Sequence, residues 1–246
     1  FYPYDMAISK SNPSVMYISG YKQVDNQYFA ALLTTSDGGN TWTDISNAVE
    51  TESYLIFTSV VIDPTDDGKV YVGGDYFYRG TKTGRDPDLS WTRSRTTYYI
   101  YSIGIDPVEP SRIYLGLYES IATSMDSGRS WNIQNNTIKR SADHIAVAPA
   151  DPSKVYVSCY AGFYKSSDFG TNWDTSHEGI YAARINAMAV DPRLILVQNS
   201  GYLMSFGRGR NNIWEDVVTP PSCGEVCDIL INPDNPNTVL ILEGYG

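Results

Sequence analysis

The segment SMDSGRSW at residues 124–131 contains the pattern that decides the fold, Ser/Thr-x-Asp-x-Gly-x-x-Trp. The segments TSDGGNTW at 35–42 and SSDFGTNW at 166–173 repeat it. The aspartate can accept backbone N–H groups of its own turn, and the glycine allows a positive φ without Cβ strain. The tryptophan then packs the hairpin onto its sheet. We call these segments the Asp-Gly-Trp turns. Their defining residues are Asp37, Gly39, Trp42, Asp126, Gly128, Trp131, Asp168, Gly170 and Trp173.

Outward from these turns, two markers repeat along the whole chain. Successive tryptophans are about 40 to 49 residues apart, at Trp42, Trp91, Trp131, Trp173 and Trp214. Prolines recur about every 42 residues, at Pro64, Pro107, Pro149, Pro192 and Pro233. Two markers with one period indicate tandem structural repeats.

Each proline follows a short apolar strand whose middle residue is often small, as at Gly104 and Ala146. Small residues are expected where the innermost strands of neighbouring sheets converge. A second apolar run, such as 113–115, follows each turn and fits a strand that is covered on both faces. Four strands per period, arranged radially, are typical of a propeller.

The sequence therefore predicts an all-β fold, a single β-propeller of four-stranded antiparallel blades over residues 1–246. It predicts five full repeats, at about 1–53, 54–97, 98–140, 141–182 and 183–224, and a partial sixth at 225–246. We expect a fragment of a larger ring, with the same polypeptide continuing beyond Gly246, because a half-built blade exposes an unpaired strand edge.

Composition limits the possible partners. The net charge of −10 disfavours nucleic acid, because a polyanion is repelled. No apolar run approaches the roughly 20 residues needed to span a bilayer, so we expect no membrane insertion. The chain starts at Phe1, so an upstream leader could have been removed.

Cysteine and histidine are sparse. Cys223 and Cys227 lie four residues apart in one loop, where a disulfide and two free thiols are equally open readings. We expect no metal site, because neither His144 nor His177 is near this pair in sequence, and the sequence indicates no cofactor.

The repeats resemble the Asp-box (bacterial neuraminidase repeat) superfamily over essentially the whole chain. That group includes sialidases, xyloglucanase-type glycoside hydrolases, sortilin-type receptors and photosystem assembly factors. The resemblance implies that the Asp-Gly-Trp turns are structural and peripheral, and that ligands bind on one face of the propeller. It also implies a secreted or cell-surface protein, extracellular or periplasmic.

That face is expected to gather the loops between the second and third strands of each repeat and the loops between repeats. Asp75 and Glu119 lie in equivalent loops of neighbouring repeats and are the candidate catalytic carboxylates. The candidate ligand-binding residues are Tyr76, Tyr78, Tyr118, Tyr160 and Arg184. The competing interpretation is that these are solvated side chains of long polar loops.

Two functions remain open. The first is a binding or scaffold module for a carbohydrate or protein partner. The second is a glycoside hydrolase of the xyloglucanase type, which needs two carboxylates flanking the scissile bond. A sialidase is disfavoured, because the Arg-Ile-Pro signature is absent; Arg112-Ile113 is followed by Tyr114.

Overall fold

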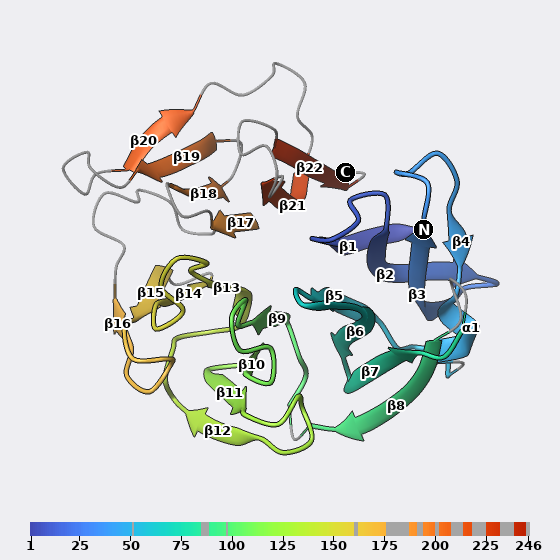
Figure 1. Ribbon diagram of the computed structural model, residues 1–246, viewed down its shortest axis with the longest axis horizontal. Coiled ribbons are helices and arrows are strands. Elements are labelled where there is room, and N and C mark those ends of the chain that lie inside the picture. The colour runs from blue at the N-terminus through green and yellow to red at the C-terminus, as the bar shows by residue number, and fades with distance from the viewer. Residues whose placement is uncertain are drawn as a thin grey trace.

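The computed structural model describes residues 1–50, 52–84, 89–96, 98–159, 162–175, 187–190, 194–199, 202–207, 214–217, 225–231 and 239–244. Over these residues the chain forms five four-stranded antiparallel sheets and a sixth sheet of two strands. Figure 1 shows the sheets arranged radially around a common axis. The predicted all-β propeller of four-stranded blades is confirmed.

The strands of each blade follow one another from the axis to the rim (Figure 1). The innermost strands are β1 (Tyr2–Ile8), β5 (Phe57–Asp63), β9 (Ser102–Ile105), β13 (Ala142–Val147), β17 (Ala187–Val190) and β21 (Glu225–Ile231). The second strands are β2 (Met16–Val24), β6 (Asp66–Gly74), β10 (Ile113–Gly116), β14 (Val155–Cys159), β18 (Leu194–Asn199) and β22 (Val239–Gly244). The third strands are β3 (Gln27–Thr35), β7 (Tyr76–Lys82), β11 (Ser120–Ser124), β15 (Gly162–Ser166) and β19 (Tyr202–Gly207). The outer strands are β4 (Thr43–Asp44), β8 (Leu89–Arg95), β12 (Asn132–Asn135), β16 (Asp174–Thr175) and β20 (Trp214–Val217).

The six innermost strands close a ring. Each contacts the innermost strand of the next blade, and β21 lies against β1. A single four-residue helical turn, α1 (Ser46–Val49), interrupts the β structure among the described residues, between the first and second blades.

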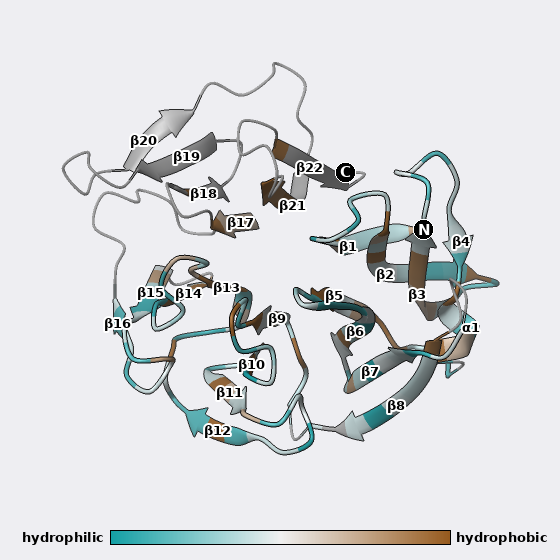
Figure 2. Ribbon diagram, viewed as in Figure 1, coloured by the Kyte–Doolittle hydropathy of each residue, from teal (hydrophilic) through white to brown (hydrophobic). Residues whose placement is uncertain are grey.

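The hydrophobic core lies in the seams between blades, because each sheet buries both of its faces against its neighbours. One seam packs Leu32 of the first blade against Val70 and Val72 of the second. In the next seam, Tyr71 and Phe77 of the second blade meet strands of the third. Figure 2 shows hydrophobic colour on inner strands such as β9 and β17, and hydrophilic colour on outer strands such as β12 and β16. This is why the second strands read as continuous apolar runs.

Close approach at the axis explains the small residues of the innermost strands. A Cβ atom added to Gly104 of β9 would lie 2.5 Å from Cγ2 of Ile145 in β13. Real Cβ atoms do not approach other atoms this closely, so a larger residue would push the two blades apart. The expected convergence of innermost strands is therefore observed at this position.

Polar contacts also join the innermost strands. The Asp5 carboxylate of β1 accepts hydrogen bonds from Ser59 Oγ at 2.6 Å and from the Val60 backbone N–H at 2.9 Å. Ser59 Oγ in turn accepts the backbone N–H of Ile103, at 3.1 Å. One buried serine in the second blade thus links the first and third blades.

Candidate functional site

The innermost strands begin, and the second strands end, at the same end of the ring. The antiparallel register places Ser102, which begins β9, opposite Gly116, which ends β10. The same arrangement holds in the first blade, where Tyr2 pairs with Tyr21. We call this end of the ring the entry face.

Tyrosine rings pack against one another across the first blade at the entry face. The rings of Tyr2 and Tyr21 are stacked, with centroids 4.7 Å apart and an interplanar angle of 9°. Tyr21 also contacts Tyr4 at 5.9 Å and Tyr28 at 5.4 Å, the latter edge to face. Tyr2, Tyr4 and Tyr28 remain 43%, 42% and 40% exposed, so this cluster faces solvent.

A second pair of tyrosine rings lies at the entry face in the third blade. Tyr99 precedes Ile100, whose backbone N–H donates to the carbonyl of Gly74 at 2.9 Å, so Tyr99 lies beside the loop that holds Asp75. Burial is the main cause that raises the pKa of Tyr99. Tyr99 packs edge to face on Tyr101, with centroids 5.2 Å apart. We call these two groups of packed rings together the tyrosine track; its members are Tyr28, Tyr21, Tyr2, Tyr4, Tyr99 and Tyr101.

Carboxylates flank the inner end of the tyrosine track. Partial burial raises the pKa of Asp75, against weaker opposing hydrogen bonds from backbone N–H groups. Burial, then the charges of Asp143 and Tyr118, raise the pKa of Tyr101. Asp143 itself accepts a hydrogen bond from Ser141 Oγ at 2.6 Å. Hydrogen bonds place both acids beside the segment that carries Tyr99 and Tyr101: Ile100 N–H donates to the carbonyl of Gly74, next to Asp75, and Ser102 Oγ–H donates to the carbonyl of Ala142, next to Asp143.

Glu119, the predicted partner of Asp75, has a backbone role in the equivalent loop of the third blade. Its φ is 53°, and its backbone N–H donates to the carbonyl of Arg140 at 2.8 Å. Its carbonyl accepts the backbone N–H of Thr137. Nearby Tyr118 is exposed and borders the track next to Tyr101.

The other candidate residues fall elsewhere. Tyr78 is only 1% exposed and lies in the seam between the first and second blades, so it is not on an open surface. Tyr76 lies beside the same seam. Tyr160, Arg184 and Cys223 lie outside the described residues, as does the side chain of Cys227, so the ligand and disulfide predictions made for them stay predictions.

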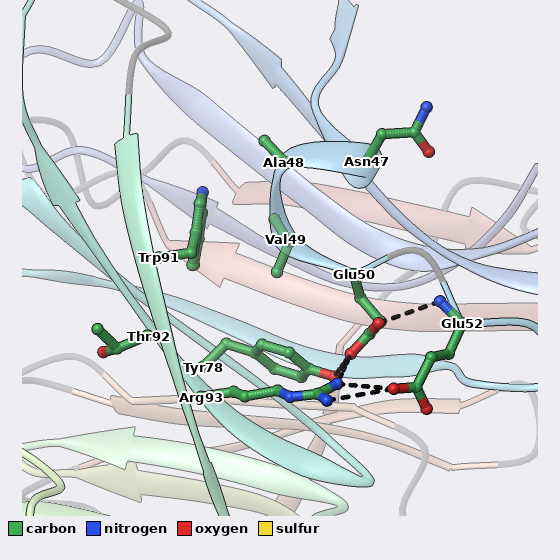
Figure 3. Close-up of a pocket in the computed structure, with 9 residues that line it drawn as sticks. All are labelled: Asn47, Ala48, Val49, Glu50, Glu52, Tyr78, Trp91, Thr92 and Arg93. Carbon is green, nitrogen blue, oxygen red and sulfur yellow. Dashed lines mark hydrogen bonds and ion pairs between the residues drawn. The ribbon is translucent and has the colours of Figure 1, made fainter.

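A pocket of about 400 Å³ lies near this seam. Figure 3 shows that Glu50, Glu52, Tyr78 and Arg93 point toward one another in it. The buried Glu50 carboxylate accepts Tyr78 Oη–H at 2.9 Å and Arg93 Nη1–H at 2.5 Å. Arg93 also pairs with Glu52 at 3.1 Å. These bonds tie Glu50, in the loop after α1, to Tyr78 of β7 and Arg93 of β8, so the cluster fastens the interblade loop to the second blade.

The Asp-Gly-Trp turns join third and outer strands at the rim. The hydroxyl group of Ser124 donates to Asp126 Oδ1 at 2.8 Å and accepts the backbone N–H of Gly128. Asp126 Oδ1 also accepts the backbone N–H of Ser130, at 2.9 Å. Equivalent bonds hold Asp37 with Thr35 and Thr41, and Asp168 with Ser166 and Asn172.

These turns also contact the preceding blade. Trp131 packs edge to face on Phe77 with centroids 5.0 Å apart, and Trp173 Nε1–H donates to Gln134 Oε1 at 3.3 Å. Trp42 differs, because 37% of its surface is exposed. The expected packing of the tryptophan onto its sheet is therefore weakest in the first blade.

Two features of the structure were not predicted from the sequence. Tyr4 and Tyr101 sit at or just before the start of an innermost strand, and only the closed ring brings their blades together. The second is a side-chain bond within each turn, which could have been predicted because a hydroxyl or amide side chain always stands four residues after the turn aspartate. Thr41, Ser130 and Asn172 all donate to the second carboxylate oxygen.

Neither metal ligands nor a membrane-spanning helix was found in the part of the chain that the structure describes. These residues contain no group of three or more His, Cys, Asp or Glu side chains placed to hold a metal ion. None of the helical structure among them is long and apolar enough to cross a bilayer.

The fold and the entry face define a β-propeller with a tyrosine-rich, acid-flanked face. No protein-family model matches the sequence, and no curated protein matches it. Among solved structures, the chain is similar to a GH74 enzyme from Niastella koreensis, with a TM-score of 0.70 and 17% identity over 99% of this chain and 44% of that one. The chain thus spans less than half of the GH74 enzymes it matches.

Two similar structures contain protein ligands. YCF48 bound to D1 peptide has a TM-score of 0.62 and 13% identity, over 99% of this chain and 75% of that one. Chaetomium thermophilum Sqt1 bound to the N-terminus of the ribosomal protein L10 has a TM-score of 0.60 and 12% identity, over 94% and 66%. At these identities the likeness establishes the propeller fold alone.

Proposed function

We propose that this propeller is a binding or scaffold module of the Asp-box type that holds a protein or carbohydrate partner on its entry face. The tyrosine track carries this proposal. Tyrosine offers a large amphipathic contact area at a low cost in side-chain entropy, which is why it is enriched at binding surfaces. Protein-bound propellers of similar fold add support.

A screen of peptide and oligosaccharide arrays tests the proposal. Ligands retained by the wild-type chain should be lost on Tyr21→Ala, because Tyr21 contacts three other rings of the track. Met125→Ala is the matched control, since Met125 is an exposed apolar residue on a rim turn. Retained binding in Tyr21→Ala, or loss in Met125→Ala, would contradict binding at the entry face.

A glycoside hydrolase is the second candidate, and it is favoured by the partial burial of Asp75, which raises its pKa in the direction that a general acid requires. The test is release of reducing ends from β-glucans, xyloglucan and sialosides. Release that Asp75→Asn or Glu119→Gln abolishes supports hydrolysis. Release that survives both substitutions, or none from any substrate, contradicts this pair as the catalytic acids.

We also propose an extracellular or periplasmic location, which rests on the resemblance to Asp-box proteins. Fractionation of the source cells tests it. Recovery in the culture medium, periplasm or cell-surface fraction supports the proposal, and recovery in the cytosol contradicts it.

A further inference from the structure

We infer that the partner of the entry face is an extended, basic peptide segment that lies along the tyrosine track, with its cationic side chains beside Asp75 and Asp143. This inference rests on the proposed binding function and names the chemistry of the ligand. It follows from how the rings pack and from the charges that surround them.

The ring geometry favours a peptide over a sugar chain. A pyranose ring stacks on a free aromatic face, but Tyr2 and Tyr21 each cover one face of the other, with ring centroids 4.7 Å apart. Tyr21 with Tyr28, and Tyr99 with Tyr101, meet at 75° and 74°. Each of these contacts occupies one ring face in its pair, or one face of each ring where they stack, while the hydroxyl groups can still hydrogen-bond the N–H and carbonyl groups of a peptide.

The charges favour a basic segment. Asp75 follows Gly74, whose carbonyl accepts the backbone N–H of Ile100 at 2.9 Å, and Asp143 follows Ala142, whose carbonyl accepts Ser102 Oγ at 2.7 Å. Both aspartates thus adjoin the segment that carries Tyr99 and Tyr101, and the whole chain has a net charge of −10. Nearby cations are engaged elsewhere: Lys22 lies 2.7 Å from Asp44, and Arg93 is held by Glu50 and Glu52. Arg140 adjoins Glu119, at the border of the track. An arginine or lysine side chain could pair with either aspartate and lie against tyrosine rings.

Fluorescence anisotropy of a labelled ten-residue peptide of alternating arginine and glycine tests the inference. The same peptide with glutamate in place of arginine, and cellohexaose as a competitor, are the comparison ligands. The basic peptide should bind more tightly than the acidic one, should weaken as salt is added, and should not be displaced by cellohexaose.

Matched variants separate specific binding from the attraction of any basic peptide to an acidic protein. Asp75→Asn and Asp143→Asn should each weaken binding about fivefold, as expected for loss of one close charge pair in water. Asp174→Asn removes the same charge from the exposed outer strand β16 and should change binding less than twofold. Near-UV circular dichroism verifies that each variant is folded.

Each outcome decides a different claim. Equal binding of basic and acidic peptides, or equal loss in Asp174→Asn and Asp75→Asn, overturns the basic-peptide inference. If cellohexaose binds instead, and Tyr21→Ala abolishes its binding, the entry face stands as a binding site and the peptide inference fails. If Tyr21→Ala leaves every interaction unchanged, the proposed function fails as well.

Discussion

Gly38 and Gly128 both adopt positive φ, at 73° and 79°, but differ in their surroundings. A Cβ atom on Gly38 would have nothing within 4 Å, whereas one on Gly128 would lie 2.2 Å from Cε1 of Phe77. We expect Gly38→Ala to cost about 1 kcal/mol of stability through backbone strain. Gly128→Ala should cost about 1–3 kcal/mol more through overpacking. Equal losses in urea denaturation would show that the turn does not press on the neighbouring blade.

The turn aspartates should make the thermal stability of the protein sensitive to acid. Hydrogen bonds from the backbone and then the side chain of Asn172 lower the pKa of Asp168 from 3.8 to about 2. The charged form therefore stabilises the fold above pH 4, and this contribution is lost as the pH falls toward 2. Asp168→Asn should reduce the difference in Tm between pH 5 and pH 2, with Asn172→Ala intermediate. An unchanged difference in Asp168→Asn would refute this role.

At the scale of elements, the loop that contains α1 is fastened to the second blade by Glu50. Tyr78→Phe removes one buried hydrogen bond to that carboxylate and should lower the free energy of unfolding by about 1–2 kcal/mol. The exposed Tyr54 lies in the same loop, so Tyr54→Phe is the matched control and should change stability little. Thermal unfolding compares the two; an equal effect would mean that the Glu50 cluster does not hold the loop.

The strands themselves were predictable, because the pattern of apolar residues along a strand shows which of its faces are buried. Ile113 and Leu115 are fully buried, as a two-sided strand requires, and Asp126 and Gly128 specify their turn locally. The tyrosine track was not predictable as a whole, because Tyr4 and Tyr99 lie 95 positions apart in the sequence and come to one face only through the packing of three successive blades. Tyr78 was misplaced on the open face for the same reason: its burial depends on the preceding blade.

At the scale of the whole molecule, Ser59 links three blades near the axis. Ser59→Ala removes the donor to Asp5 and the acceptor for the Ile103 N–H, which should cost about 2–4 kcal/mol. Because the ring unfolds as a unit in this account, the urea midpoint should fall without a change in m-value. Ser36→Ala, at an exposed turn position, should leave the midpoint unchanged. A normal midpoint in Ser59→Ala would argue against this linkage.

Hydrogen–deuterium exchange in the presence of the tightest ligand from the array screen tests the binding face most directly. Binding at the entry face should protect backbone amides at 2–5, 20–28 and 98–103, which contain the tyrosine track. The rim turns at 35–42, 124–131 and 166–173 should exchange as they do in the free protein. Protection confined to the rim turns, with the track segments unchanged, would contradict the central claim.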